Sequence, residues 1–204
     1  MTTHIDLHIR RGSTFTQGIR WHSEKWLYAA IDTISKGAPV AVTTTTPHGI
    51  PHGWEVAVVD AVGMTQLNAT GNPPKAKDMR RATFVGANVI EFNPISSAAY
   101  PAHRQGTGYL AWLAPKSLAG CAARMQIRDS VGGNVLFSLT SAPGGGILLD
   151  DVEKAIEFTL TAEQAESAAS ASGVHDLEIV SPGGVVTALI EGAVTFGAET
   201  TVTQ

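Results

Sequence analysis

The sequence is nearly free of cysteine, since Cys121 is the single one among 204 residues. An internal disulfide is therefore excluded, and with it the disulfide framework that is typical of small secreted domains. Cys121 lies among small residues at the expected start of a strand, which favours a buried, inert thiol over a catalytic nucleophile. The redox environment of the protein stays open.

Long apolar runs are missing as well. No stretch approaches the about 18 uninterrupted apolar residues of a membrane-spanning helix. Residues 1–6 lack the basic segment followed by an apolar segment that marks a secretory signal. We therefore expect a soluble protein without a membrane partner.

Neither sign of charge is in large excess, because Lys and Arg number 14 against 18 Asp and Glu, a net charge of −4 at pH 7. Nucleic-acid-binding domains usually carry a basic patch. The densest basic stretch, Lys75 to Arg81, is interrupted by Asp78, and we interpret it as a solvated loop or helix end. We expect no nucleic-acid partner.

Motifs of catalysis and metal binding are also scarce. No Gly-x-Ser-x-Gly motif occurs, and the glycines at 144–146 precede a predicted strand rather than the Lys-Ser or Lys-Thr of a phosphate-binding loop. His48 and His52 could share a metal ion with His22 or His103, but we find no Cys, Asp or Glu near enough in the sequence to complete a tetrahedral set of ligands. We favour a turn with surface histidines.

The one acidic cluster lacks the alternating ligand spacing of a helix-loop-helix calcium site. It contains Asp150, Asp151, Glu153 and Glu157. We interpret it as a charged turn rather than as a calcium site. The sequence therefore predicts no catalytic residue, no cofactor and no metal ion, and we expect that the protein is not an enzyme.

The chain does contain many segments in which apolar and polar residues alternate. In residues 122–128 the alternation places Ala123, Met125 and Ile127 on one face, and a second run covers 134–140 after a Gly-Gly turn. This pattern predicts a central hairpin with one buried face, which needs a second layer to cover it.

Similar patterns predict strands in most of the remaining chain, separated by Gly- and Pro-rich turns. Residues 63–68 are expected to be a short extended piece, and Thr161 followed by Gln164 predicts the start of one short helix. Evenly spaced strands of this kind favour an all-β protein with a β-sandwich. The predicted strands are 5–10, 14–21, 37–46, 54–60, 83–85, 89–92, 146–149, 155–160, 174–180 and 185–196.

The order of the predicted strands suggests that one domain is split by another. The N-terminal strands are too few to form a domain, and the C-terminal strands have an edge to fill. We therefore expect residues 1–31 and 108–204 to form a discontinuous, immunoglobulin-like β-sandwich, with residues 32–107 inserted as a small β-barrel.

Aromatic residues make up only 6% of the chain, but several of them are bunched. Trp21, Trp26 and Tyr28 lie close together in the sequence, as is typical of a seam between layers or domains. Together with Trp54 and Trp112 they are our candidate interface residues. The alternative, that these side chains belong to an ordinary core, stays open.

A set of short segments in the first and last parts of the chain carries a resemblance to a known family. The segments are Asp6–Gly12, Thr14–Thr16, Ile19–Trp21, Ala123–Asp129, Gly132–Gly133, Leu139–Ser141, Asp176–Ile179 and Leu189–Gly192. Within residues 120–196 they resemble a family of tailed-bacteriophage virion proteins, similar to the N-terminal domain of the phage upper baseplate protein that carries receptor-binding proteins. The opening segments resemble the first strands of the same domain, which supports the split arrangement.

The middle of the chain carries a second resemblance, through residues 47–54 and 62–68. It is similar to a small β-barrel found in phage tail proteins and in the first catalytic-cysteine half-domain of ubiquitin-activating enzymes. No adenylation motif or catalytic-cysteine context accompanies it, so the enzyme activity does not carry over.

These resemblances imply a structural component of a bacteriophage virion. We expect first a tail or baseplate adaptor that connects the tail or the head-tail connector to fibres or receptor-binding proteins. Its partners would be other phage structural proteins, and the symmetry of tails implies a cyclic homo-oligomer. It would be made in the cytoplasm of the host bacterium and act in the virion. The alternatives are a capsid decoration protein and a carbohydrate-binding module that uses the aromatic residues as a sugar platform.

Overall fold

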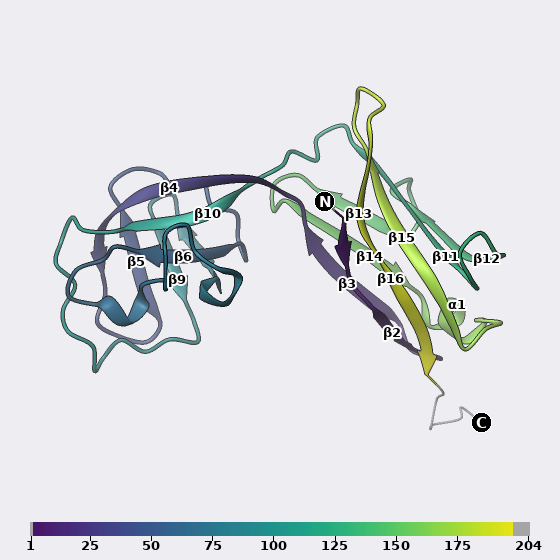
Figure 1. Cartoon of the computed structure of the whole chain (residues 1–204), viewed down its shortest axis with the longest axis horizontal. Helices are drawn as coiled ribbons and strands as arrows, with labels where there is room; N and C mark the ends of the chain where they lie inside the picture. Colours follow the sequence, from purple (N-terminus) through teal and green to yellow (C-terminus); the bar gives the residue numbers. More distant parts are fainter. Residues whose placement is uncertain (1, 198–204) are drawn as a thin grey trace. The chain divides into compact units, whose positions relative to one another are not determined.

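Strands form nearly all of the regular structure in the computed structural model, which describes residues 2–197. The chain divides into two compact units, each with its own hydrophobic core. Unit 1 consists of residues 1–21 and 117–204, and unit 2 of residues 22–116 (Figure 1). The predicted all-β class is confirmed.

Unit 1 is a sandwich of two sheets (Figure 1). The larger sheet has the order β1-β16-β15-β11-β12, with β2 also paired to β16, and the smaller has the order β13-β14-β3. Both sheets supply side chains to one core. The strands are β1 (Thr3–His4), β2 (Leu7–Arg10), β3 (Phe15–Arg20), β11 (Ala122–Arg128), β12 (Val135–Thr140), β13 (Ile147–Asp150), β14 (Ala155–Leu160), β15 (Ser172–Val180) and β16 (Val186–Gly197).

The central hairpin forms as predicted, by the antiparallel pairing of β11 with β12. Ala123, Met125 and Ile127 are at most 4% exposed and face the smaller sheet, which contributes Ile156 and Phe158 to the same core. The predicted short helix is also confirmed as α1 (Ala162–Glu166), which begins with a reciprocal pair of hydrogen bonds between Thr161 and Gln164.

The N-terminal strands complete the sandwich, as expected from their number. β1 and β2 run parallel to β16 at one edge of the larger sheet. β3 instead pairs antiparallel with β14 in the smaller sheet. Two strands that follow one another in the sequence therefore lie in opposite layers, and the first 20 residues cover edges that belong to the C-terminal half.

The N-terminal strand is held on β16 where it breaks between β1 and β2. The backbone N–H of Ile5 donates to Glu191, and its carbonyl oxygen accepts a hydrogen bond of 2.8 Å from Nε2 of His175 in the core. This approach requires a glycine at position 192, because a Cβ atom there would lie 2.1 Å from the Ile5 carbonyl oxygen. Burial lowers the pKa of His175, whose Nδ1 has no hydrogen-bond partner among residues 2–197.

Unit 2 is a single seven-stranded sheet that curls into a nearly closed barrel, with the order β7-β6-β10-β4-β5-β9-β8. Its interior is filled by apolar side chains such as Val42, Val58, Phe92 and Leu110, all fully buried. The strands are β4 (His22–Ile34), β5 (Val40–Thr44), β6 (Glu55–Val59), β7 (Arg80–Arg81), β8 (Thr83–Gly86), β9 (Val89–Phe92) and β10 (Tyr109–Pro115), with 3-10 helices η1 (Thr65–Leu67) and η2 (Ala76–Asp78).

The boundaries of the inserted unit differ from those we expected, 31/32 and 107/108, and lie at 21/22 and 116/117 instead. The reason is the length of β4, which runs for 13 residues and pairs with β10 from Ala30 opposite Tyr109 to His22 opposite Pro115. Residues 22–31 thus belong to the barrel. The expected extended piece at 63–68 is also wrong, since it contains η1.

Replacing Gly192 should destabilise unit 1. Gly192→Ala places a methyl group on the Ile5 carbonyl, and we expect a loss of about 1–3 kcal/mol in the free energy of unfolding. Gly18→Ala in β3 is the matched control, because no atom lies within 4 Å of its added Cβ and the smaller freedom of the unfolded chain stabilises by about 0.4–1 kcal/mol. Urea denaturation of both variants measures the difference, and equal stability of the two would contradict this packing.

The stability of unit 1 should also fall in mild acid. Because burial keeps the pKa of His175 below its ordinary value of 6.5, the neutral ring is the folded form. The associated stability is complete above pH 6.5 and decreases as the pH falls below it. Melting temperatures between pH 7.5 and 5 should therefore drop less for His175→Gln, whose amide can still donate to Ile5, than for the wild type. Burial in unit 2 also lowers the pKa of His48, so the stability of unit 2 decreases over the same pH range. The His175→Gln variant retains this second decrease.

Candidate binding surface of unit 2

Two of the five candidate interface residues are core residues. Trp54 and Trp112 are each 3% exposed and lie inside the barrel of unit 2. Trp54 donates from Nε1 to the carbonyl oxygen of Leu113 at 3.0 Å, whereas Nε1 of Trp112 has no hydrogen-bond partner in the described chain. Neither side chain is available to a partner on the surface, so this part of the expected interface is withdrawn.

A third candidate, Trp21, belongs to unit 1. Its side chain is half-buried and packs against the core of the sandwich. The bunching of Trp21 with Trp26 and Tyr28 in the sequence therefore spans the boundary between the two units and does not describe one surface.

The two remaining candidates lie together on the outer face of unit 2. In the β4–β10 pair, Trp26 is opposite Leu113, and Tyr28 and Tyr109 stand on the same face through their partners Ala111 and Ala30. We call Trp26, Tyr28, Tyr109 and Leu113 the aromatic strip. The two tyrosines are each 45% exposed, and Trp26 and Leu113 are half-buried without joining either core cluster.

Small apolar side chains lie on the same face of the sheet as the strip. Val59 is opposite Tyr109, and Ala57 is opposite Ala111, which in turn is opposite Tyr28. Ala57, Val59 and Ala111 are at most 2% exposed, although none of them belongs to the core cluster of the barrel. The outer face of β6, β10 and β4 thus carries a second, thin apolar layer of its own.

Polar side chains border the tyrosine end of the strip. The Tyr28 hydroxyl donates to Oδ1 of Asn72 at 2.8 Å, and Nδ2 of Asn72 donates to Oδ2 of Asp60 at 3.1 Å. The rings of Tyr28 and Tyr109 stand at 89° to each other with their centroids 6.5 Å apart. Tyr109, Asn72 and Asp60 are exposed residues that the sequence analysis did not single out.

The loop that carries Asn72 is fixed at both ends by side chains. On one side, the amide of Asn68 both accepts from the backbone N–H of Ala61 and donates to its carbonyl oxygen. On the other, Oδ2 of Asp78 accepts from the hydroxyl of Thr70 and the backbone N–H of Lys75. Burial alone would raise the pKa of Asp78, but these hydrogen bonds lower it overall. The loop therefore holds Asn72 in place.

The histidines that could have formed a metal site have other partners. His48 is buried rather than on the surface, contrary to our expectation, and its Nδ1 accepts from the backbone N–H of Ile50 while Nε2 donates to Gly86. His22 and His103 donate to the carbonyl oxygens of Ser23 and Thr107. Within residues 2–197, no three His, Cys, Asp or Glu side chains are grouped as metal ligands.

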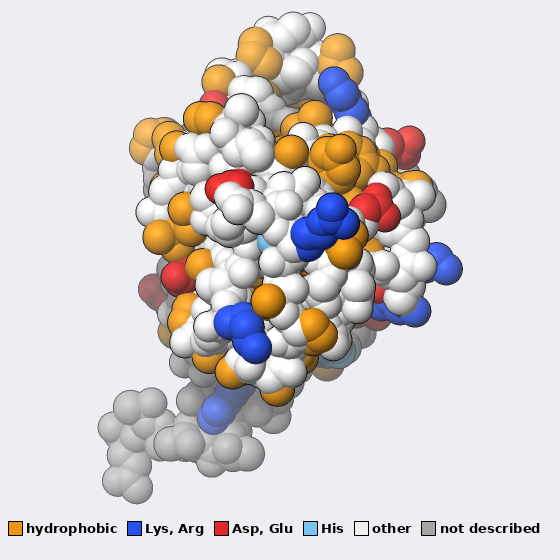
Figure 2. Space-filling model, turned by 90° about the vertical axis from the view of Figure 1, so that its left-hand side faces the viewer, with side chains coloured by type: hydrophobic (Ala, Val, Ile, Leu, Met, Phe, Trp, Pro, Cys, Tyr) orange, Lys and Arg blue, Asp and Glu red, His pale blue; other side chains and the backbone are white. Residues whose placement is uncertain are grey.

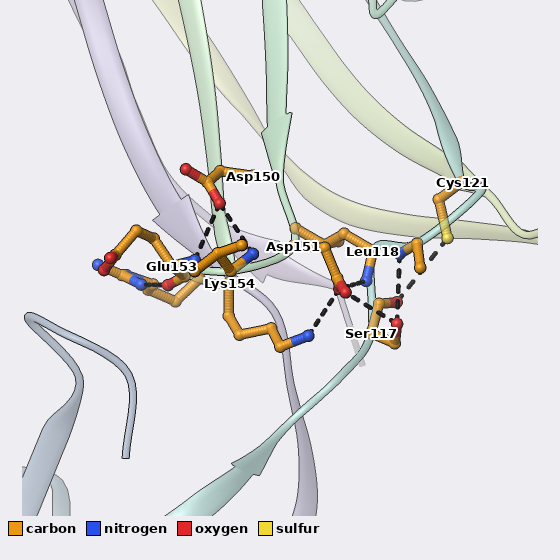
Figure 3. Close-up of polar contacts among 10 residues, drawn as sticks. Ser117, Leu118, Cys121, Asp150, Asp151, Glu153 and Lys154 are labelled. Atoms are coloured by element: carbon orange, nitrogen blue, oxygen red, sulfur yellow. Dashed lines mark hydrogen bonds and ion pairs between the residues drawn. The ribbon is translucent and has the colours of Figure 1, made fainter. Parts of the chain in front are cut away.

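The acidic cluster forms a turn between β13 and β14 (Figure 3). Oδ1 of Asp150 accepts from the backbone N–H groups of Val152 and Glu153. Oδ1 of Asp151 lies 2.7 Å from Nζ of Lys154 and accepts from the backbone N–H of Leu118 at 2.5 Å. These contacts occupy the carboxylates in the manner of a structural turn.

The turn also fixes the two places where unit 1 continues into unit 2. Asp151 holds Ser117 and Leu118 at the start of the returning chain (Figure 3). The guanidinium of Arg20 donates to the carbonyl oxygen of Glu153. Next to it, the half-buried Cys121 makes a weak contact from Sγ to the Ser117 carbonyl oxygen at 3.8 Å. The segment of unit 1 that precedes the inserted unit and the segment that follows it are thus attached to one turn.

Charges of both signs are interspersed on the face of unit 2 shown in Figure 2, with hydrophobic side chains scattered among them. In the basic stretch Lys75 to Arg81, Asp78 is buried and caps η2, while Arg80 donates to the Leu67 carbonyl oxygen. Among residues 2–197, no helix has the length and apolar character needed to cross a membrane.

No protein-family model matches the chain, and no curated protein is significantly similar to it.

Removing the carboxylate of Asp151 should loosen the turn. The hydrogen bond from Lys154, aided by those from Leu118 and Ser117, lowers the pKa of Asp151 to about 2. Its contribution to stability is complete above the ordinary value of 3.8 and is lost as the pH falls towards 2. Asp151→Ala should therefore melt at a lower temperature than the wild type at pH 7, and the gap should close near pH 2.

The matched control is Glu157→Ala, which removes an exposed carboxylate of the same cluster from the outer face of β14. It should melt as the wild type does at both pH values. A pH-independent gap between Asp151→Ala and the wild type would contradict the assigned role of the carboxylate.

Proposed function

We propose that the chain is a structural protein of a bacteriophage virion, an adaptor that joins the tail or the head-tail connector to fibres or receptor-binding proteins. The observation that carries the proposal is the aromatic strip on unit 2. Its four side chains lie outside the barrel core, and its two tyrosines are 45% exposed. In this role the protein performs no catalysis.

The strip has the chemistry of a protein-docking surface. Tyrosine and tryptophan are enriched at interfaces, where their rings supply a large contact area and their polar groups retain hydrogen bonds. Trp26 and Leu113 are apolar neighbours on a paired, rigid part of the sheet, so a partner would meet a preformed surface. Such aromatic anchors often carry most of the binding energy of an interface.

The two-unit construction also supports an adaptor. Each unit has its own core and its own surface, so that unit 1 and unit 2 can each bind a different neighbouring protein. We infer from the resemblance of residues 120–196 to phage virion proteins that the two neighbours belong to a phage particle. We propose other phage structural proteins as partners, a cyclic homo-oligomer as the assembled form, synthesis in the cytoplasm of the host bacterium, and the tail as the final location.

Mass spectrometry of purified particles tests the proposal, with this chain quantified against the major capsid and tail proteins before and after removal of the tails. About six or twelve copies per particle, lost with the tails, are expected from cyclic assembly. Hundreds of copies retained on heads would instead assign a capsid decoration protein. Absence from both would overturn the virion role.

Trp26→Ala should reduce incorporation into particles by at least about tenfold, as expected for an interface anchor. The purified variant should keep its fold, because Trp26 is outside both cores. Phe84→Ala is the matched control, since Phe84 is 46% exposed on the same unit but away from the strip on β8. Equal incorporation of the two variants, measured by the same mass spectrometry, would count against the strip as the docking surface.

A further inference from the structure

The tyrosine end of the aromatic strip combines exposed rings with a fixed set of polar atoms. Tyr28, Tyr109, Asn72 and Asp60 are all exposed, and two successive hydrogen bonds connect Tyr28, Asn72 and Asp60. The apolar end, with Trp26 and Leu113, has no such polar chain among the described contacts. We name the four residues Tyr28, Asn72, Asp60 and Tyr109 the tyrosine corner. The name refers only to this surface of unit 2 and not to the tyrosine-corner motif of Greek-key sandwiches.

We infer that the tyrosine corner binds a neutral saccharide. A pyranose has apolar faces of C–H groups and a rim of hydroxyls, so its recognition requires a flat apolar surface beside hydrogen-bonding groups. Tyrosine rings provide the flat surface. A carboxylate accepts from hydroxyl groups and an amide both donates and accepts, which suits the hydroxyl rim.

The two rings have a geometry that suits this ligand. Their planes are perpendicular, at 89°, so the pair presents two aromatic walls rather than one continuous plane. A sugar ring can lie flat on one wall and place its edge against the other. The buried alanines and valine on the same face keep both tyrosines on a rigid sheet.

The polar atoms keep capacity for a ligand. In the described chain, the hydrogen bond of Asp60 from Asn72 uses Oδ2 and leaves Oδ1, and Asn72 donates only one of its two amide hydrogens. The Asn72–Asp60 bond also orients both groups towards one another, next to the hydroxyl of Tyr28. A vicinal pair of hydroxyls could therefore donate to Asp60 and accept from Asn72 at once.

The corner is preorganised on both sides. Asp60 has a left-handed backbone conformation, with φ of 57°, which few residues other than glycine, Asn and Asp adopt readily. Asn68 and Asp78 fix the loop around Asn72, as described above. Because these groups are already fixed, less conformational entropy is lost when a ligand binds.

The charge of the corner selects among sugars. Its one charged group is the carboxylate of Asp60, so a sugar that carries its own carboxylate or sulfate would be repelled. A neutral hexose or N-acetylhexosamine would not. This inference does not rest on the virion role. It assigns Tyr28 and Tyr109 to a saccharide, so that the docking of a protein partner rests on Trp26 and Leu113 at the other end of the strip.

The purified full chain can be tested on an array of neutral glucose-, galactose-, mannose- and N-acetylglucosamine-containing oligosaccharides, with sialylated and uronic-acid oligosaccharides for comparison. Neutral glycans should bind and acidic ones should not. A nuclear magnetic resonance titration with the best neutral glycan should shift signals of the tyrosine corner. Binding of no neutral glycan would overturn the inference, as would a preference for acidic glycans.

Variants locate the site. Tyr109→Ala removes one wall, and Asp60→Asn removes the charge with little change in shape, so each should weaken binding of the neutral glycan at least about tenfold. Phe84→Ala removes an equally exposed ring elsewhere on unit 2 and should bind as the wild type does. Circular dichroism checks that both variants are folded, and Asp60→Asn keeps the test decisive if Tyr109→Ala does not fold. Normal glycan binding by folded Asp60→Asn or by folded Tyr109→Ala would overturn the assignment to this corner.

Because the glycan measurement uses the isolated chain, its failure is separate from failure of the virion role. A chain that is retained in tails but binds no neutral glycan would overturn the saccharide site alone. In that case the tyrosine corner would be part of the protein-docking surface. A chain that binds the glycan but is absent from particles would overturn the virion role alone.

Discussion

The pairing of β4 with β10 is the contact on which unit 2 depends. It places Leu110 and Trp112 inside the barrel and Tyr28 and Tyr109 outside it. It also ends with His22 opposite Pro115, so that the chain enters and leaves unit 2 at neighbouring positions. One ladder of backbone hydrogen bonds therefore joins the first and last strands of the inserted unit, separates its core from its surface, and carries the aromatic strip on its outer face.

In unit 1, segments far apart in the sequence are held together by side-chain hydrogen bonds as well as by strand pairing. Its first strands lie against β16 and β14, and the bond from His175 to Ile5, together with the missing side chain of Gly192, lets the N-terminal strand approach β16 closely. At the other end, the turn that contains Asp151 holds both points where the chain departs. In this unit the carboxylate of Asp151 and the ring of His175 take part in structural hydrogen bonds.

Only part of the candidate surface can be predicted from the sequence. Trp26 and Tyr28 were found because aromatic residues bunch there, but Trp54 and Trp112 were included wrongly, since an exposed and a buried tryptophan have the same appearance in a single sequence. Tyr109, Asn72 and Asp60 were missed. Each is isolated in the chain, and they meet Tyr28 only because a distant strand and a fixed loop bring them there.

Patterns between near neighbours in the sequence are sufficient to predict three local elements: the hairpin of β11 and β12, the hairpin of β15 and β16, and the capped start of α1. Alternation, turn glycines and a capping pair act between near neighbours, so their signals are complete within a short segment. The boundaries of unit 2 and the inward or outward direction of its tryptophans depend on the tertiary fold. Residues 22–30 carry no clear alternation, because both faces of β4 are partly covered there, and the pairing of β4 with β10 joins segments far apart in the chain.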